Sequence, residues 1–302
     1  MVRQGLLCGS ALILISLTAE ALPSTAPAFA RVAAVQPPVW VERAGATAAL
    51  AVGAPLYEGD RYFTGPGARL HISLVDASTV KLGENAEFSL PVLALKRADA
   101  DAPGFLKGAL KVLKGAFRFT TSALGKLKKR EIEVSIGPTI TAGIRGTDIW
   151  GKSDPEQELL CLLEGQIEIG SPGHATQVMD QARTFYVVPH GKNPLPVAPA
   201  PDEKLEKWVP QTELRPDEAA LLVGGAYKVG LSSSANRAAA ETEVMALAVK
   251  GYAAEVMAAD VQGRMRYRVV LSGLASLADA TRYAELMKQR LGYKTPWVIN
   301  DR

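Results

Sequence analysis

Three cations near the C-terminus have the spacing of a polar binding surface. Lys228 precedes Val229, and Arg266 and Arg268 flank Tyr267. Successive side chains of a strand point to opposite faces, so the cations are expected on the face opposite the apolar residues. Ammonium and guanidinium groups form charge-assisted hydrogen bonds with hydroxyls and carboxylates. The chemistry that this pattern predicts is the binding of a polar or acidic ligand.

Catalytic chemistry finds little support in the rest of the chain. The three histidines are scattered at His71, His174 and His190, and no Cys/His spacing suits zinc. Neither a nucleophile elbow, nor a phosphate-binding loop, nor a dinucleotide fingerprint is present. The net charge of +3 is too small to indicate a nucleic-acid partner. The sequence therefore predicts a protein that is not an enzyme, without metal or cofactor and without nucleic acid.

The cations belong to a unit that occurs twice. The stretch YKVGLS at 227–232 recurs as YRVVLS 40 residues later. In each copy a strand-like alternation is followed by apolar residues at helical spacing. Asn236 and Ser276 are expected N-caps, and Gly251 and Gly292 follow the helices, where a left-handed residue ends a helix. Two βαβ units predict an α+β domain: a four-stranded antiparallel sheet with both helices on one face and the other face open.

This repeat resembles the SPOR domain, a module that binds peptidoglycan glycan strands from which the stem peptides have been removed. The resemblance covers residues 225–299 and implies that the open face binds glycan. In that family the open face carries a glutamine, a serine, an aromatic residue and an arginine. Ser233 and Arg268 fill the serine and arginine positions, whereas Gly230 and Arg266 replace the glutamine and the aromatic residue. We therefore expect a peptidoglycan-binding site at Lys228, Ser233, Arg266 and Arg268 that lacks the family's stacking platform on the third strand.

The N-terminus has the layout of a secretory signal peptide. Arg3 precedes an apolar run at residues 6–17, and the small-x-small pattern of residues 28–30 comes before Arg31. Cleavage is expected after Ala30, or alternatively after Ala21, which predicts export to the periplasm. The apolar run is too short for a transmembrane helix, and no later segment reaches the required length. The mature chain then keeps one cysteine, Cys161, whose apolar neighbours indicate a buried structural residue.

A proline-rich segment, residues 189–222, is expected to separate two domains as a semi-rigid extended spacer. Seven prolines lie between Pro189 and Pro216. Trp208 interrupts the segment and is expected to dock on a neighbouring domain.

Residues 49–188 read as an all-β domain. Short alternating stretches are separated by turn residues at regular intervals, which predicts a β-helix-like coil or a sandwich. Residues 105–119 fit either a short amphipathic helix or an irregular pair of strands.

Several motifs of this domain resemble the FecR family, an exported β-rich sensing or interaction module. The match is carried by GAFRF at 115–119, by GIRGTD at 143–148 and by the turns at residues 58–60, 76–78 and 83–85. Arg145 and Asp148 are expected to brace a turn around Gly146.

The sequence thus predicts a non-enzymatic periplasmic protein with two binding domains. The leading hypothesis is a cell-envelope adaptor in which the SPOR-like domain binds peptidoglycan glycan strands and the FecR-like domain binds an envelope protein or a ligand. An alternative is a signalling or assembly module whose two domains bind only proteins, and an envelope hydrolase is a more distant one. The expected segments are a signal peptide at 1–30, a FecR-like domain at 49–188, a linker at 189–222 and a SPOR domain at 223–302.

Overall fold

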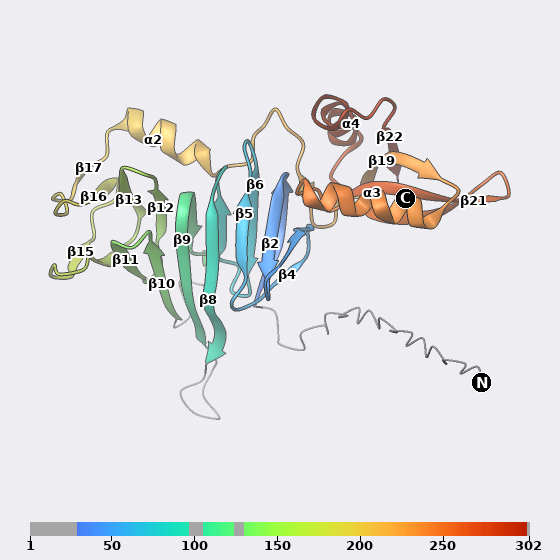
Figure 1. The fold of residues 1–302 in the computed structure, drawn as a ribbon. Helices are drawn as coiled ribbons and strands as arrows, with labels where there is room; N and C mark the ends of the chain where they lie inside the picture. The colour runs from blue at the N-terminus through green and yellow to red at the C-terminus, as the bar shows by residue number, and fades with distance from the viewer. Residues whose placement is uncertain (1–28, 97–104, 124–129, 301–302) are drawn as a thin grey trace, which may run out of the picture.

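The structure is a computed structural model, which describes residues 29–96, 105–123 and 130–300. The predicted signal peptide lies outside the described residues except for its last two positions. Strands make up most of the described chain, and three α-helices accompany them (Figure 1). No helix in the described ranges is long and apolar enough to cross a bilayer.

The first domain consists of two facing sheets that share one long strand. In spatial order one sheet contains β4 (Pro55–Leu56), β1 (Ala30–Gln36), β6 (Arg69–Leu74), β7 (Thr79–Leu82), β9 (Phe105–Thr120), β12 (Asp148–Ser153), β13 (Gln157–Glu164), β16 (Thr184–Pro189) and β17 (Ala198–Pro199). The other contains β3 (Ala46–Ala49), β2 (Val39–Arg43), β5 (Arg61–Thr64), β8 (Glu87–Lys96), β9, β10 (Arg130–Ile136), β11 (Ile140–Ile144), β14 (Ile167–Gly170) and β15 (Gln177–Met179).

Strand β9 passes from one sheet to the other at Gly115. Its first half pairs with β8 and β10, and its second half pairs with β7 and β12. Gly115 has a φ of +83°, and a Cβ there would lie 2.6 Å from the Cα of Ala86, so only glycine fits the crossing. Of the two sequence readings of residues 105–119, the structure has the strand.

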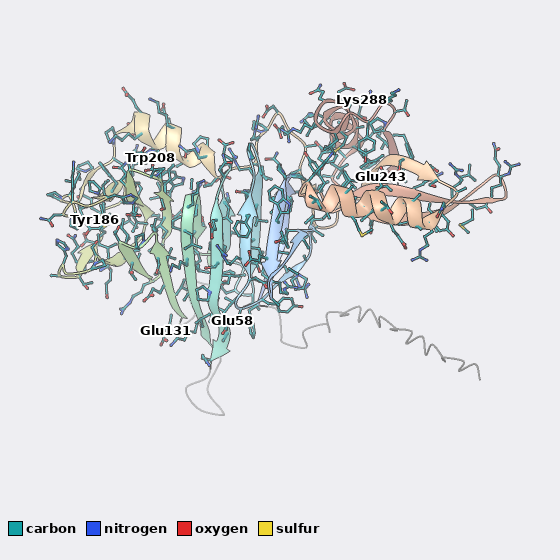
Figure 2. The ribbon with its side chains drawn as sticks, viewed as in Figure 1. Glu58, Glu131, Tyr186, Trp208, Glu243 and Lys288 are labelled. Atoms are coloured by element: carbon teal, nitrogen blue, oxygen red, sulfur yellow. The ribbon has the colours of Figure 1, made fainter. Side chains whose placement is uncertain are left out.

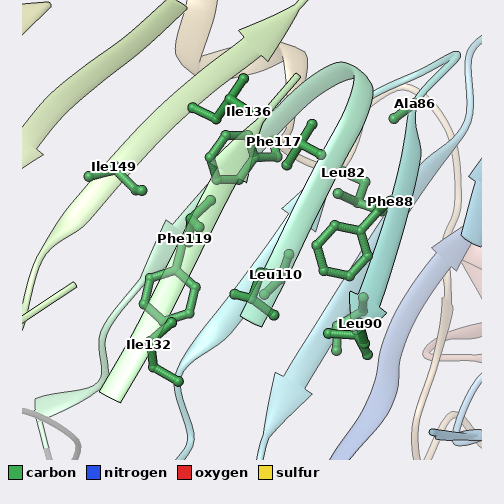
Figure 3. Packing of buried hydrophobic residues seen from close by; sticks show 14 of the residues in the cluster. Leu82, Ala86, Phe88, Leu90, Leu110, Phe117, Phe119, Ile132, Ile136 and Ile149 are labelled. Atoms are coloured by element: carbon green, nitrogen blue, oxygen red, sulfur yellow. The ribbon is translucent and has the colours of Figure 1, made fainter. Parts of the chain in front are cut away.

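A single core fills the space between the two sheets. Phe88 and Leu110 come from one sheet, Phe117 and Ile149 from the other, and all are almost fully buried (Figure 3). The sandwich is therefore the correct one of the two predicted architectures.

The C-terminal domain has the predicted α+β architecture. Its sheet has the order β22 (Trp297–Asn300), β19 (Tyr227–Ser234), β21 (Arg264–Leu274) and β20 (Glu255–Val261), with all neighbours antiparallel. Helices α3 (Arg237–Val249) and α4 (Leu277–Leu291) pack on one face, over a core that includes Val229 and Val269.

Local residues define the ends of both helices as predicted. The side chain of Asn236 accepts hydrogen bonds at the start of α3. Ser276 caps α4 by accepting from the backbone N–H of Asp279. Gly292 ends α4 with a φ of +76°.

The expectation that residues 189–222 form an extended spacer is wrong. The segment forms helix α2 (Asp202–Trp208), a 3-10 turn at Val209–Gln211 and strand β18 (Leu221–Leu222). Instead of leading away from the first domain, it lies across the outer face of one sheet. Trp208, labelled beside α2 in Figure 2, docks on Trp150 of the sheet, as predicted.

The two domains are in direct contact. Strand β18 pairs with β1 of the first domain and with β21 of the second, which joins their sheets. The backbone N–H of Val39 donates to the carbonyl of Gly251 at 3.0 Å, and the Trp40 indole N–H donates to the carbonyl of Val249 at 3.2 Å. Arg290 of α4 forms an ion pair with Glu218 at 2.7 Å.

Candidate functional site

A bulge in β19 determines which side chains lie on the open face of the C-terminal sheet. Before the bulge, Val229 points into the helical core and Gly230 faces the opposite side. The register shifts between Gly230 and Ser232, so that Ser232 turns toward α3 and donates to Glu243 at 2.5 Å. Ser233 consequently lies on the open face, opposite Arg268 of β21.

An indole covers the centre of this face. Trp297 of β22 pairs with Gly230, so both project to the open side. A Cβ at Gly230 would lie 2.3 Å from the Trp297 indole, which therefore lies directly across the glycine. Val270, the other cross-strand neighbour of Gly230, is fully buried although it also faces this side. Any side chain at position 230 would displace the indole, so the glycine makes room for a flat aromatic surface.

Polar groups of β19 and β21 share the open face with the indole. The guanidinium of Arg266 donates through Nη2 to the Ser233 carbonyl at 2.6 Å and through Nε to the Ser233 hydroxyl at 3.3 Å. These bonds fix the arginine against the bulged end of β19. Arg268 is half-buried next to Met257 in the neighbouring strand. Lys228 lies two residues along β19 from Gly230, between Ile299 and Ser272.

The outer face of the first domain carries a second cluster of charges. Arg118 of β9 makes a bidentate pair with Asp148 of β12, at 2.9 and 2.6 Å. Glu213 of the 189–222 segment accepts from Arg118 at 2.8 Å and from Lys81 at 2.6 Å. Burial raises the pKa of Glu213, but the Lys81 hydrogen bond and the charges of Lys81 and Arg118 outweigh burial and lower that pKa overall. The cluster attaches the segment to the sheet.

An aromatic contact at Trp208, five residues before Glu213, holds the same segment to the sheet. The rings of Trp208 and Trp150 stack with centroids 5.4 Å apart and planes at 5°, and Phe185 meets Trp208 edge-on at 5.7 Å. Beneath them lies a small apolar cluster that includes Cys161, whose thiol pKa burial raises to about 12. Cys161 is therefore a buried structural residue, as predicted.

A polar cleft of about 250 Å³ lies beside this segment. It contains charges of both signs, with Lys152 paired to Asp154 at 3.4 Å. In the described parts of the chain, no group of three or more His, Cys, Asp or Glu side chains is placed to hold a metal ion.

Each of the two domains matches a protein-family model. Residues 60–168 match the model for FecR protein, and residues 223–300 match the model for the SPOR domain. The chain joins a FecR domain to a SPOR domain. SPOR implies peptidoglycan binding and FecR implies a signalling role, and both are binding or regulatory families rather than catalytic ones.

A comparison with curated proteins found no match to the chain. Two crystal structures of a candidate anti-sigma factor from Parabacteroides distasonis ATCC 8503 are similar to it in part. The structure at 1.65 Å has 12% identity and a TM-score of 0.39, covering 49% of this chain and 64% of its own. The structure at 2.50 Å has 10% identity and a TM-score of 0.38, covering 70% of this chain and 98% of its own.

All four residues predicted for the SPOR site lie on one face, but not in one group. Ser233, Arg266 and Arg268 are neighbours, whereas Lys228 stands on the other side of the Gly230 position. Their role in binding remains a prediction. Trp297 was missed by the sequence reasoning. Strand alternation with the core residue Val298 could have placed Trp297 on the open face. Only the pairing of Trp297 with Gly230 shows that the indole covers the glycine.

The two FecR motif residues expected to brace a turn do not meet in that way. Arg145 is 80% exposed and lies 3.7 Å from Glu168, whereas Asp148 is paired with Arg118 of the GAFRF motif. The expectation of a local brace is wrong because β9 and β12 are neighbours, which brings two distant motifs together. Sequence reasoning also missed Glu213, which joins this pair from outside the FecR match.

Proposed function

We propose that this protein is an exported cell-envelope adaptor, in which the SPOR domain binds peptidoglycan glycan strands and the FecR domain binds an envelope protein. The observation that carries the proposal is the open face of the SPOR sheet. Trp297 lies across Gly230, and Ser233, Arg266 and Arg268 lie farther along β19 and β21 on the same face. The function is binding, without catalysis and without a cofactor.

The arrangement has the parts that sugar recognition needs. Sugars present apolar ring faces that pack on aromatic side chains, and hydroxyls that take hydrogen bonds from fixed donors. The half-buried indole of Trp297 provides the flat surface that the family places on its third strand. Arg266 is held by Ser233, so little side-chain freedom is lost when its remaining donors bind ligand.

The connection between the domains favours an adaptor over two independent binding modules. Strand β18 links the two sheets, and the segment before it is attached to the FecR domain through Glu213 and Trp208. A partner on the FecR domain would therefore be held at a defined orientation to the glycan strand. A flexible spacer would not impose that orientation.

Export rests on the signal-peptide layout, and the fold bears on where cleavage occurs. Ala30 is buried and pairs with Leu56 and Leu74, and the carbonyl of Phe29 accepts from the backbone of Val75. Cleavage after Ala30 would remove the first residue of β1 and Phe29, which precedes it. We therefore expect the mature chain to begin at Leu22, the alternative site. N-terminal sequencing of the periplasmic protein distinguishes cleavage after Ala21 from cleavage after Ala30. An intact Met1 or a cytosolic location would contradict export.

The binding proposal is tested with the purified protein and amidase-treated peptidoglycan sacculi in a pull-down titration. Losing a hydrogen bond from a charged group costs roughly 1.5–3 kcal/mol, about ten- to a hundredfold in affinity. We expect losses of this size for Arg268→Ala and about tenfold for Trp297→Ala. Arg237→Ala, an exposed arginine of α3 on the helical side, is the matched control and should bind as the wild type does.

Circular dichroism establishes that each variant is folded. If the folded wild-type protein is not retained on amidase-treated sacculi, the glycan-binding proposal is wrong. The alternative, a module that binds only proteins, then takes its place.

A further inference from the structure

The hairpin of β20 and β21 extends beyond the four-stranded sheet. Strand β19 ends at Ser234, opposite Tyr267, so residues 264–266 pair only with residues 259–261. Figure 1 shows this two-stranded ribbon projecting past the helices into solvent. The ribbon therefore continues the open face in the direction of β21, away from Trp297.

A row of arginines follows this direction. Arg264, Arg266 and Arg268 alternate along β21 with Met265 and Tyr267, and Tyr267 packs against the helical core. All three arginines consequently face the open side. Alternate residues of a strand are about 6.6 Å apart, so the row is about 13 Å long.

No carboxylate in the described ranges lies directly across the ribbon from this row; Glu255, on the same face, stands opposite Val270 and accepts from the Ser272 hydroxyl. The cross-strand neighbours of Arg264, Arg266 and Arg268 are Val261, Ala259 and Met257. Among the residues that the structure describes, none of the three arginines forms an ion pair. Asp260 belongs to the other face of the ribbon, where its carboxylate accepts from the Gly263 N–H. Three like charges in a row with no carboxylate opposite them are complementary to an external polyanion.

We propose that this arginine row binds the carboxylates of an acidic glycan strand that leaves the Trp297 platform along β21. The inference rests on the proposed glycan binding and names its chemistry. In peptidoglycan the stem peptide is joined by an amide to the lactyl group of muramic acid. Where an amidase has hydrolysed that amide, the lactyl group carries a free carboxylate. The row then distinguishes such strands by their charge, because the lactyl group carries no charge while it is joined to the stem peptide by an amide.

The experiment compares two preparations of the same amidase-treated sacculi. One keeps its free carboxylates, and in the other they are converted to neutral methylamides with carbodiimide and methylamine. Retention of the full chain is titrated on both for the wild type, for Arg264→Gln and for Arg237→Gln. Arg264 is chosen because it is exposed, pairs only within the ribbon and lies outside the predicted site.

We expect the wild type to bind the neutral sacculi about tenfold more weakly than the acidic ones. Arg264→Gln should lower the affinity for acidic sacculi about two- to fivefold, the size of effect expected for an exposed ion pair. Its affinity for neutral sacculi should be unchanged. Arg237→Gln removes the same charge from the helical side and should match the wild type on both. Raised salt should reduce the difference between the two preparations.

Each contrary result has a distinct meaning. Equal binding of the wild type to acidic and neutral sacculi overturns the carboxylate proposal and leaves glycan binding intact. An equal loss for Arg264→Gln and Arg237→Gln shows that only net charge matters and also overturns it. Absence of retention on either preparation overturns glycan binding itself and the present inference with it.

Discussion

Replacing Trp208 with alanine should release the 189–222 segment from the FecR domain. Trp208 is the aromatic contact between α2 and the sheet, stacked on Trp150 and edge-on to Phe185. Aromatic pairs contribute roughly 0.5–1.5 kcal/mol beyond their buried area. Full burial would make a Trp→Ala change cost about 3–5 kcal/mol, but Trp208 is only partly buried. We expect a loss of about 2 kcal/mol in the free energy of unfolding.

Two measurements test this expectation. Urea denaturation followed by circular dichroism gives the loss in stability, with Trp208→Phe as the control that keeps a stacked ring and should lose less than half as much. Limited proteolysis should cut the alanine variant first near α2, because that helix contributes no buried residue of its own. A loss below about 0.5 kcal/mol together with an unchanged cleavage pattern would refute the view that the ring stack holds the segment.

Three further predictions concern single residues. The His190 imidazole lies 2.7 Å from the buried carboxylate of Glu158, and that hydrogen bond raises the pKa of His190. The resulting stabilisation is complete below the unfolded pKa of about 6.5 and is lost as pH rises through the higher folded pKa. The Tm difference between wild type and His190→Gln should therefore shrink from about pH 5 to about pH 8.5, and a constant difference would contradict it. Gly151→Ala places a Cβ 2.5 Å from the Phe117 ring and should cost about 1–3 kcal/mol or more in urea denaturation; a neutral result would mean that the core can shift. Val269→Asp puts a charge in the fully buried core of the SPOR domain and should abolish its cooperative unfolding, which native-like thermal melting of the variant would disprove.

Local sequence patterns were sufficient for much of the fold. The helix caps at Asn236 and Ser276, the left-handed glycine at 292 and the burial of Cys161 all follow from near neighbours in the chain. The placement of Lys228, Arg266 and Arg268 on one face follows from strand alternation, because that period is a property of the backbone itself.

Patterns with two physical readings were decided only by tertiary contacts. Residues 105–119 carry apolar side chains at spacings compatible with helix and strand, and pairing with four other strands selects the strand. The prolines at 189–216 indicate extended backbone wherever nothing packs on it. They carry no information about Trp150 or Arg118, which hold that segment to the sheet.

The amino-acid pattern alone predicts the order of the two domains, the SPOR repeat and the cations of its open face, because each of these is recognised from motifs and strand alternation that need no knowledge of tertiary contacts. The tertiary structure decided that Trp297 lies over Gly230, that Asp148 pairs with Arg118, and that Glu213 joins them. Each of these contacts joins segments that lie far apart in the chain: 30 positions separate Arg118 from Asp148, 67 separate Gly230 from Trp297, and 95 separate Arg118 from Glu213. A strand's own sequence fixes which side chains share a face, whereas the partner strand and its register fix what they meet there.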